Sequence, residues 1–332
     1  MSGFKAFRVH RDEGGVHGEL ETITLNDLSD GDVVIRAAYS GVNYKDALAA
    51  TGKGKIMRHF PMVGGVDVSG HVESSSSPLL EAGQPVIVAG FGLSEAHDGG
   101  FSERVRVPAE WVVPLPSGLT LREAMVLGTA GLTVGLAVHQ MERMGQIPDL
   151  GPILVTGSTG GVGSLAVDIL SARGYEVHAL TGKTQAADYL SKLGATEVVL
   201  QSELDFGSRP LESTRFGGAL DNVGGDVLAW LTRTVAPLGN IASIGLAGGS
   251  GLNTTVMPFI LRGVNLLGIN SVLCPADLKH EVWTRLGRDL KPQHVDLIGE
   301  REVSLDQLSS VFEDYIERRV TGRTVVAIDS SV

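Results

Sequence analysis

The glycine-rich segment at residues 153–163, ILVTGSTGGVG, constrains the fold more than any other part of the chain. An apolar run with strand character leads into four glycines within seven residues, and a helical pattern follows at once. Small residues let a phosphate approach the backbone, and the free N–H groups at the helix start can bind it. Ser158 stands at the first glycine position of the usual fingerprint, and a plain strand-to-helix turn is the alternative interpretation. We interpret the segment as a dinucleotide-binding turn because strands and helices alternate around it.

This alternation of strands and helices extends over the middle of the chain. Expected strands cover residues 153–156, 176–180, 197–200, 219–221, 240–245 and 266–270, and expected helices cover residues 162–173, 185–193 and 227–235. Gly174 and Gly194 stand directly after the first two helices, a typical place for glycine at a helix C-terminus. The pattern predicts an α/β fold with a doubly wound parallel sheet, the Rossmann architecture.

The flanking regions have a different character. Short strand-like segments at residues 32–38, 66–72 and 84–90, with a serine-rich loop at 73–78, predict a small β-rich domain, a partly closed barrel. Thr120 and Glu123 form a capping box that begins a long helix reaching about Met144. Further helices are expected at residues 276–290 and 305–317, the second capped by Ser304 and Gln307. A last strand at 324–328 is expected to return to the first domain.

Length, charge and cysteine content narrow the class of protein. The 332 residues suit two domains, and the net charge of −11 gives no general attraction to nucleic acid, so we expect no such partner. Cys274 is the single cysteine, which excludes an internal disulfide and fits a cytoplasmic protein. We find no signal-like stretch at residues 1–10 and no uninterrupted apolar run that spans a bilayer, and we expect no membrane partner.

The end of the strand after the glycine turn indicates the cofactor. NAD-dependent enzymes usually place Asp or Glu there, where the carboxylate binds the ribose 2′-hydroxyl. Here the sequence reads HALTGK at residues 178–183, and the nearby Glu176 stands at the start of the strand. An acid would repel a 2′-phosphate, whereas Thr181 and Lys183 can donate hydrogen bonds to it. We therefore predict NADPH; the alternative for Lys183 is an ordinary exposed lysine at a helix start.

The histidine and cysteine content argues against a metal site. A zinc site needs several Cys or His ligands, and one cysteine excludes a four-cysteine site. The nine histidines form no cluster with ligand spacing. We expect His10, His17 and His97 to be surface loop residues and predict no metal.

Several motifs together resemble a known superfamily. They are GVNYKD at 41–46, GTAGLT at 128–133 and the glycine turn, with TGKGKI at 51–56, MPFILRGV at 257–264, GINSV at 268–272 and GRTVV at 322–326. In order and over essentially the whole chain, they resemble the medium-chain dehydrogenase/reductase superfamily, in its zinc-independent acryloyl-CoA reductase and quinone oxidoreductase branch. The zinc members place Cys where Asn43 stands and His where Val66 stands, next to an acid matched by Asp67.

The resemblance implies a domain plan and a set of cofactor contacts. A GroES-like catalytic domain would comprise residues 1–126 and 273–332, and a Rossmann NADP-binding domain residues 127–272. The implied contacts are Tyr44 near the nicotinamide, Thr159, Gly160, Gly161 and Val162 at the pyrophosphate, Thr181, Gly182 and Lys183 at the 2′-phosphate, Gln201 at the adenosine, Leu246, Ile260 and Ser271 around the nicotinamide pocket, and Arg318. Plain core packing is the alternative for Leu246 and Ile260.

The resemblance also implies an activity. NADPH would reduce the carbon–carbon double bond of an α,β-unsaturated acyl-CoA, acryloyl-CoA to propionyl-CoA, by hydride transfer to the β-carbon without a metal. Tyr44 is our candidate catalytic residue, as donor or positioner near the reacting atoms; a packing tyrosine, with a water as the proton source, is the alternative. An NADPH-dependent quinone oxidoreductase is the second hypothesis, and a binding or structural protein without turnover is the third.

Two further expectations concern the substrate and the assembly. Lys53, Lys55 and Arg58 are three cations without an acid in residues 51–60 of an acidic chain, and they directly follow the NYKD motif. We expect them to bind the coenzyme A phosphates; the alternative is a solvated surface loop.

The apolar segment 265–270, NLLGIN, is the expected edge strand of the Rossmann sheet. Pairing of this edge across a two-fold axis predicts a homodimer.

Overall fold

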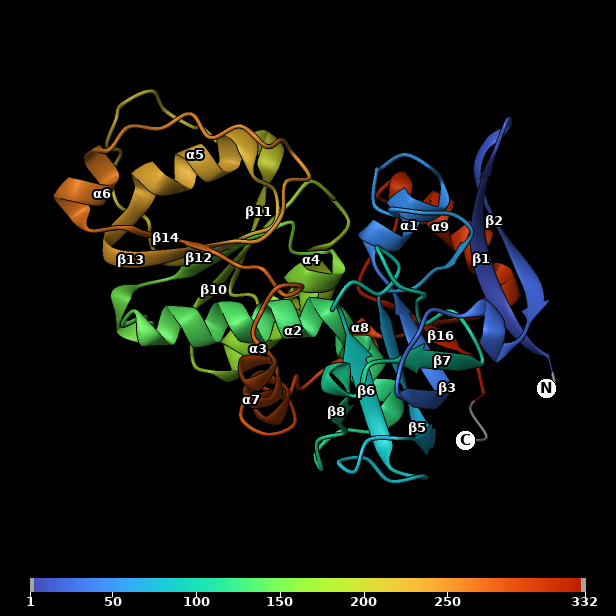
Figure 1. The fold of residues 1–332 in the computed structure, drawn as a ribbon. Helices are drawn as coiled ribbons and strands as arrows, with labels where there is room; N and C mark the ends of the chain where they lie inside the picture. Colours follow the sequence, from blue (N-terminus) through green and yellow to red (C-terminus); the bar gives the residue numbers. More distant parts are fainter. Residues whose placement is uncertain (1–2, 330–332) are drawn as a thin grey trace. The chain divides into compact units, whose positions relative to one another are not determined.

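A computed structural model describes residues 3–329 (Figure 1). The chain forms two compact units, which are described separately below. The first unit comprises Met1–Leu132, Val272–Gly287 and Val295–Val332, and the second comprises Thr133–Ser271 and Arg288–His294. The fold is therefore mixed α/β, with a β-rich unit and a unit built on a parallel sheet.

The second unit contains the predicted doubly wound sheet. Six parallel strands lie in the order β11-β10-β9-β12-β13-β14. Their bounds are β9 Ile153–Thr156, β10 Val177–Thr181, β11 Glu197–Leu200, β12 Phe216–Asp221, β13 Val235–Ser243 and β14 Asn265–Gly268. The helices between them are α3 Gly161–Ala172, α4 Ala187–Lys192, α5 Gly225–Thr234 and α6 Met257–Arg262, with short 3₁₀ turns at Pro148–Leu150 and Gln201–Glu203. Figure 1 shows α5 on one face of this sheet and α3 on the other.

The sequence of this unit explains why its glycine turn lies at one edge of the sheet. β9 and β12 are buried along their whole length, as expected for parallel strands covered on both faces. Because all six strands are parallel, their carboxyl ends meet at the same edge, and the glycine turn leaves β9 there. A Cβ atom at Gly163 would collide with the Gly157 carbonyl, so the close approach of helix to strand requires glycine.

A buried carboxylate fixes a distant segment to the second unit. Asp168 on α3 is 1% exposed and accepts hydrogen bonds from the backbone N–H groups of Gln293, at 3.1 Å, and His294, at 2.7 Å. This contact explains why residues 288–294 pack with the second unit although the chain on both sides of them belongs to the first.

The first unit contains two sheets. One has the order β2-β1-β4, and the other has the order β15-β16-β3-β5-β6-β8, with β7 also paired to β3. The strands are β1 Phe4–Asp12, β2 Gly15–Ile23, β3 Val33–Val42, β4 Met62–Val63, β5 Asp67–Ser75, β6 Pro85–Ala89, β7 Arg104–Val107, β8 Val113–Pro114, β15 Arg301–Ser304 and β16 Thr324–Ala327. The last strand returns to this unit as predicted, because β16 pairs antiparallel with β3.

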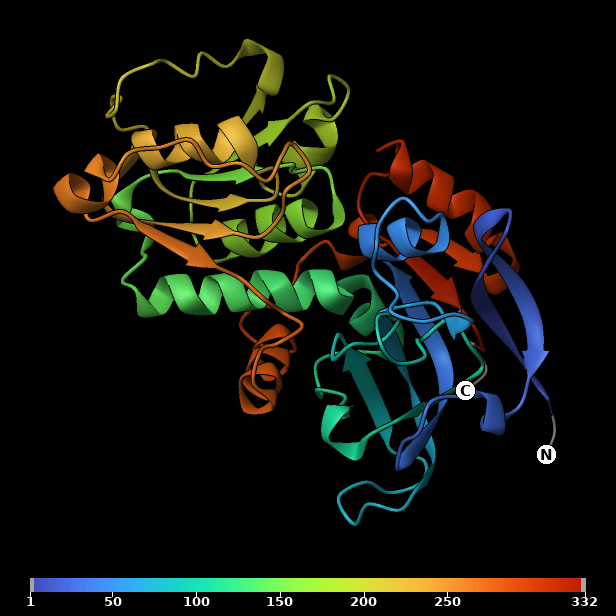
Figure 2. The same ribbon diagram turned by 45° about the horizontal axis from the view of Figure 1, so that its top comes forward.

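Helices close the first unit around an apolar core. They are α1 Tyr44–Ala50, α7 Ala276–Leu286, α8 Val295–Ile298 and α9 Leu308–Ile316, with 3₁₀ turns at Leu25–Asp27, Ala109–Trp111 and Leu305–Gln307. Figure 2 shows α9 beside α1, and Ala47, Ala50, Val311 and Phe312 share the apolar cluster between them. The predicted capping box at Ser304 and Gln307 is present.

Helix α2, Leu121–Arg143, begins at the predicted capping box and runs from the first unit into the second. It is kinked at Gly128, where φ is 49° and ψ is −150°, a bend that the sequence pattern did not reveal. Its length and mean hydropathy of 1.4 over 18 residues would suffice to cross a membrane, but 78% of that window is buried inside the protein. In this structure α2 is therefore a core helix.

Three expectations for the first unit were wrong. The hairpin β1–β2 was not predicted, and it places His10 and His17 as cross-strand partners rather than in loops. His97 is 9% exposed, and its ring nitrogens lie 3.0 Å from the carbonyl oxygens of Asp98 and Asp30. Part of the expected loop at 73–78 is strand, because β5 continues to Ser75 and pairs with β3 there.

Candidate functional site

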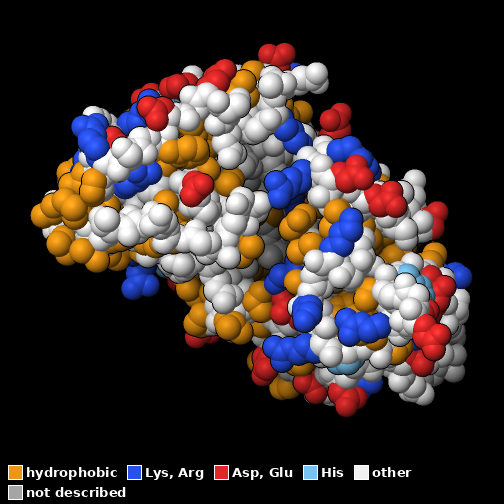
Figure 3. Space-filling model, turned by 90° about the horizontal axis from the view of Figure 1, so that it is seen from above, with side chains coloured by type: hydrophobic (Ala, Val, Ile, Leu, Met, Phe, Trp, Pro, Cys, Tyr) orange, Lys and Arg blue, Asp and Glu red, His pale blue; other side chains and the backbone are white. Residues whose placement is uncertain are grey.

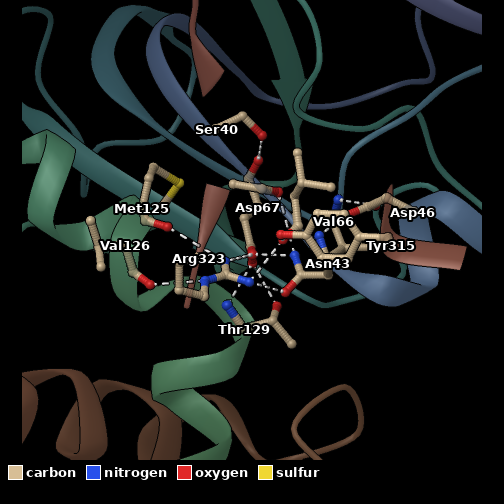
Figure 4. Close-up of polar contacts among 12 residues, drawn as sticks. Ser40, Asn43, Asp46, Val66, Asp67, Met125, Val126, Thr129, Tyr315 and Arg323 are labelled. Atoms are coloured by element: carbon tan, nitrogen blue, oxygen red, sulfur yellow. Dashed lines mark hydrogen bonds and ion pairs between the residues drawn. The ribbon is translucent and has the colours of Figure 1, made fainter. Parts of the chain in front are cut away.

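A buried carboxylate at the start of β5 organises a polar centre in the first unit (Figure 4). Asp67 is 0% exposed, and it accepts hydrogen bonds from the side-chain amide of Asn43, at 2.7 Å, and from the backbone N–H of Thr129, at 2.9 Å. The Thr129 hydroxyl also donates to it. A buried carboxylate needs such donors, because an unpaired charge in a low-dielectric interior is costly.

Arg323 supplies the balancing charge from the other end of the chain. Its Nη2 lies 3.7 Å from Asp67 Oδ2, and its Nη1 donates to the Asn43 side-chain oxygen and the Val42 carbonyl, both at 2.9 Å. Its Nε donates to the Val126 carbonyl at 2.9 Å. Asn43 thus donates to the anion and accepts from the cation, and Figure 4 shows the guanidinium at the middle of the group.

Two glycines make room for this ion pair. A Cβ atom at Gly128 would lie 2.5 Å from Asp67 Oδ2 and 2.9 Å from Arg323 Nη2, and the positive φ of Gly128 also favours glycine. A Cβ atom at Gly41 would lie 2.8 Å from Arg323 Nη2. These glycines belong to the GVNYKD and GTAGLT motifs, so the structure gives both motifs a physical reason.

A second buried carboxyl group fixes the backbone on both sides of the centre. Asp46 is 2% exposed, and it accepts hydrogen bonds from the N–H groups of Asn43, at 2.8 Å, and Val66, at 3.1 Å. Burial raises the pKa of Asp46 to about 7, the hydrogen bonds from Asn43 lower it, and the nearby charge of Asp67 raises it further. This carboxyl group can therefore hold or release a proton near neutral pH.

The structure places the remaining predicted residues of the first unit on its surface. Tyr44, directly after Asn43, begins α1 and is 45% exposed. Lys53, Lys55 and Arg58 are exposed in the segment that follows α1. Arg318 is also exposed, just after α9, and has a φ of 58°.

The positions that bear zinc ligands in other superfamily members hold no thiol or imidazole. Asn43 belongs to the ion-pair network, and Val66 is 4% exposed. Within residues 3–329, one group of side chains has metal-like spacing, formed by His10, Glu19 and Glu21 on the β1–β2 hairpin. Arg8 also contacts Glu21 there, at 3.3 Å, and His10 contacts Glu21 directly.

In the second unit, most of the predicted cofactor residues meet at the carboxyl edge of the sheet. These residues are Thr159, Gly160, Gly161 and Val162 after β9, Thr181, Gly182 and Lys183 after β10, Gln201 after β11, Leu246 after β13, and Ser271 after β14. Leu246 is 68% exposed, which excludes core packing for its side chain.

The shape of this edge fits a dinucleotide. A Cβ atom at Gly182 would have no atom within 4 Å, and a Cβ atom at Gly160 would approach only the Gly157 carbonyl, at 3.4 Å. Space is therefore open above both glycines. Burial lowers the pKa of Lys183, and the Lys183 N–H donates to the Thr181 hydroxyl at 3.1 Å. The turn after β10 thus has a defined shape and presents a partly desolvated cation.

Ile260 does not lie at the carboxyl ends of the strands, where the other predicted cofactor residues meet. It lies on α6, which precedes β14, and it is 71% exposed. The neighbouring Arg262 donates to the carbonyls of Arg233 and Val235, where β13 begins. Because the strands are parallel, the start of β13 and the glycine turn lie at opposite edges of the sheet. Ile260 is therefore remote from the glycine turn of its own unit, and its side chain is not core packing.

Sequence reasoning missed a buried acid beside the glycine turn. Asp221 ends β12 and accepts hydrogen bonds from the Thr156 hydroxyl, at 2.7 Å, and the Gly224 N–H, at 2.8 Å. Burial raises the pKa of Asp221, and these hydrogen bonds lower it. Its contacts join the end of β9 to the turn after β12. An acid at the end of a buried strand was the available signal.

The residues of the polar centre were missed as a group. In the sequence, Asn43 was noted only as the residue in place of a zinc ligand and Asp67 only as the matching acid beside Val66, while Asp46 and Arg323 were only letters in the NYKD and GRTVV motifs. Asn43 and Arg323 are 280 residues apart, so no local pattern could have joined them.

Two protein families match this chain, one over part of each unit. The family described as "Alcohol dehydrogenase GroES-like domain" matches residues 29–117, and the family described as "Zinc-binding dehydrogenase" matches residues 161–286. The chain is 45% identical to "Putative quinone oxidoreductase YhfP" of Bacillus subtilis, over 98% of this chain and 99% of that protein. It is 43% identical to "Acrylyl-CoA reductase AcuI" of Ruegeria pomeroyi, over 98% and 100%.

Solved structures of relatives have the same fold. The crystal structure of YhfP with NAD bound has a TM-score of 0.96 at 44% identity and covers 98% of this chain and 100% of that one. The YhdH oxidoreductase of Salmonella enterica in complex with NADP has a TM-score of 0.95 at 42% identity, covering 98% and 99%. The protein is therefore an oxidoreductase of the medium-chain dehydrogenase/reductase superfamily and belongs to the family that includes AcuI and YhfP.

Proposed function

We propose that this protein reduces the carbon–carbon double bond of an α,β-unsaturated acyl-CoA with NADPH, converting acryloyl-CoA to propionyl-CoA without a metal. The observation that carries the proposal is the presence of Asn43 and Val66, rather than Cys and His, at the expected zinc-ligand positions of a chain that is 43% identical to an acrylyl-CoA reductase. A double bond conjugated to a thioester is already electrophilic, so its reduction needs positioned donors rather than a Lewis acid.

The second unit supplies the residues that would hold the cofactor, whose chemistry is to supply the hydride. The open space over Gly160 and Gly182 admits phosphates, and Lys183 with the Thr181 hydroxyl would receive the 2′-phosphate. No carboxylate stands in residues 177–187, where an NAD enzyme would place one. The NADP in the YhdH structure favours this choice, whereas the NAD in the YhfP structure makes a direct test necessary.

The first unit supplies the residues that would serve the acyl group. Hydride addition to the β-carbon leaves negative charge on the thioester oxygen as an enolate, and a proton then reaches the α-carbon. The Tyr44 hydroxyl is our candidate donor, because its residue follows Asn43 at the start of α1 and its side chain is half exposed. A water molecule is the alternative proton source.

With one free cysteine in the sequence, we place the enzyme in the cytoplasm.

The central test compares substrates. We expect NADPH oxidation by the native enzyme with acryloyl-CoA or crotonyl-CoA, and a kcat/KM for benzoquinone that is lower by about tenfold or more, because benzoquinone lacks the coenzyme A phosphates. Absorbance at the NADPH maximum measures all three. Turnover of benzoquinone but of neither thioester would establish the quinone oxidoreductase hypothesis, which the YhfP relative supports. NADPH binding with no turnover at all would favour a binding protein.

Cofactor choice is tested at Lys183. Lys183→Glu places a negative charge where the 2′-phosphate would lie, and charge-assisted hydrogen bonds are the stronger kind, so KM for NADPH should rise about tenfold or more. KM for NADH should change little. Lys192→Glu makes the same change in charge at the end of α4 and serves as the control. Equal effects on NADPH and NADH would refute the role of Lys183.

Binding of coenzyme A is tested at Lys53 and Lys55. The double change to Glu should raise KM for acryloyl-CoA about tenfold and leave KM for benzoquinone unchanged, because only the thioester carries phosphates. Added salt should raise KM for the native enzyme and lower it for the variant, since attraction is replaced by repulsion. The control combines Lys5→Glu with Lys192→Glu. An unchanged KM for acryloyl-CoA would make these lysines an ordinary solvated surface.

The edge strand β14 and α6 form the surface that we propose for a homodimer. β14 ends the sheet, and Leu238, Val256, Ile260 and Leu261 are each more than 60% exposed. Figure 3 shows hydrophobic side chains gathered at the left end of the view, where α6 lies. A second copy, turned about a two-fold axis, would continue the sheet and cover these side chains. Ile260 would then face the partner.

Sedimentation tests the dimer. The native enzyme should sediment as a dimer at micromolar concentration, and Leu261→Asp should give a monomer, because a charge would be buried in the apolar contact. Leu79→Asp, at a side chain of the first unit that is 83% exposed, should leave the dimer intact. A monomeric native protein would contradict the proposal.

A further inference from the structure

A fully buried lysine in the first unit has no role in the proposed function. Lys279, in the first turn of α7, is 0% exposed. Its Nζ lies 3.2 Å from the centre of the Phe91 ring, and it donates to the carbonyl oxygens of Val272, at 3.2 Å, and Ala89, at 3.5 Å. Buried lysines are rare unless their charge is compensated. Here two carbonyl dipoles and the face of an aromatic ring compensate part of it.

Phe91, the residue under this ammonium group, has an unusual backbone conformation. Its φ is 56°, which is rare for a bulky residue and persists only where the surroundings hold it. Its ring also stacks on Trp111, with ring centres 5.7 Å apart and planes at 7°. Phe91 is therefore held by stacking on Trp111 and by a cation close to its ring.

This arrangement lies beside the polar centre described above. Ala89, which accepts from Lys279, is the cross-strand partner of Asp67 in the pair β5–β6. The next residue, Gly90, donates its N–H to the Val66 carbonyl at 3.0 Å, and the Val66 N–H donates to Asp46. The turn at Phe91 thus begins two residues beyond the strand position that faces Asp67.

The hydrogen bond from Lys279 to the Val272 carbonyl connects it to the segment that leads into α7. Val272 directly follows Ser271, a residue expected at the nicotinamide pocket. One ammonium group therefore joins the turn at Phe91 to the segment that leads into α7.

We propose that the charged form of Lys279 is a positioning residue for the reduction, which fixes the Phe91 turn and the Val272 segment around the substrate. This inference rests on the proposed function for its catalytic part. Lys279 acts through Phe91 and Val272 and does not touch the substrate itself, since its side chain has no exposed surface. Loss of its charge should loosen both segments and weaken the productive binding of the acyl group.

The effect of pH follows from burial. Desolvation lowers the pKa of Lys279 to about 8, while electrostatic interactions with Cys274, before α7, and Asp67, on β5, oppose this shift. Above pH 8 the neutral amine loses its attraction to the Phe91 ring. In the unfolded chain the amine would keep its usual pKa of 10.5, so the unfolded state binds more protons between these values. Raising the pH from 8 toward 10.5 therefore favours the folded state through this group. A loss of activity in this range would not reflect unfolding caused by Lys279.

The experiment compares Lys279→Arg, which keeps the charge, with Lys279→Met, which keeps the length without charge. We expect kcat/KM of the native enzyme for acryloyl-CoA to fall above about pH 8. Lys279→Arg should remain active to at least one pH unit higher, because a guanidinium stays charged. Lys279→Met should lose about tenfold in kcat/KM at pH 7 and approach the native value at high pH.

Fluorescence gives a second readout that needs no substrate. Trp111 touches the Phe91 ring, so its emission, taken as the difference from Trp111→Phe, should titrate near pH 8 in the native enzyme and not in Lys279→Arg. His97 also contacts Trp111, with ring centres 4.9 Å apart, and His97→Gln serves as the control for the effect of this ring on the emission. If Lys279→Met fails to fold, the native titration and its loss in Lys279→Arg still decide the question.

The outcomes separate this inference from the proposed function. A native enzyme that does not reduce enoyl-CoA would overturn the proposed function, whatever the fluorescence shows. Trp111 emission with the same pH midpoint in the native enzyme and in Lys279→Arg would overturn the inference about Lys279. Unchanged kcat/KM in a folded Lys279→Met at pH 7 would also overturn it, leaving Lys279 a packing residue.

Discussion

The buried pair of Asp67 and Arg323 is the interaction on which the first unit depends. Neither side chain reaches solvent appreciably, so each charge relies on the other and on the donors and carbonyls around it. Removing one partner of such a pair leaves an unpaired buried charge, at a cost of about 3–5 kcal/mol. Gly41 and Gly128 have no side chain and so leave the space that the pair requires. The bend in α2 at Gly128 is thus part of the same construction as the ion pair.

Asn43, whose position resembles a zinc-ligand position of other superfamily members, is part of the network around this pair. Asn43 donates to Asp67 and accepts from Arg323, so a neutral amide stands between two charges. The Arg323 guanidinium and the N–H groups of Asn43 and Thr129 bring positive charge to the Asp67 carboxylate. The local backbone is fixed separately, by the hydrogen bonds from Asn43 and Val66 to Asp46.

Local sequence patterns predicted the second unit well because short segments of sequence, such as glycine turns and apolar runs, define its strands and helices. Strands β9 and β11 have the predicted bounds, since a glycine turn ends the first and an apolar run defines the second. The hairpin β1–β2 was missed because β2 is largely exposed and carries few apolar residues. β5 extends into the serine-rich segment because pairing with β3 outweighs the preference of serine for turns. The candidate site followed the same division: the glycine turn was visible in one segment, whereas the network of Asp67 and Arg323 depends on contacts across the whole chain.

The position of β16 in the first unit has a consequence for the order in which the chain can fold during synthesis. β16 lies between β15 and β3, and Arg323 immediately precedes it, so the sheet and its buried charges are incomplete until residue 327 has left the ribosome. The second unit contains no residue beyond His294. Domains generally fold as units during translation. The second unit can therefore form before Arg323, the ion-pair partner of Asp67, has been synthesised. The unit that begins at the N-terminus is therefore the last to be completed.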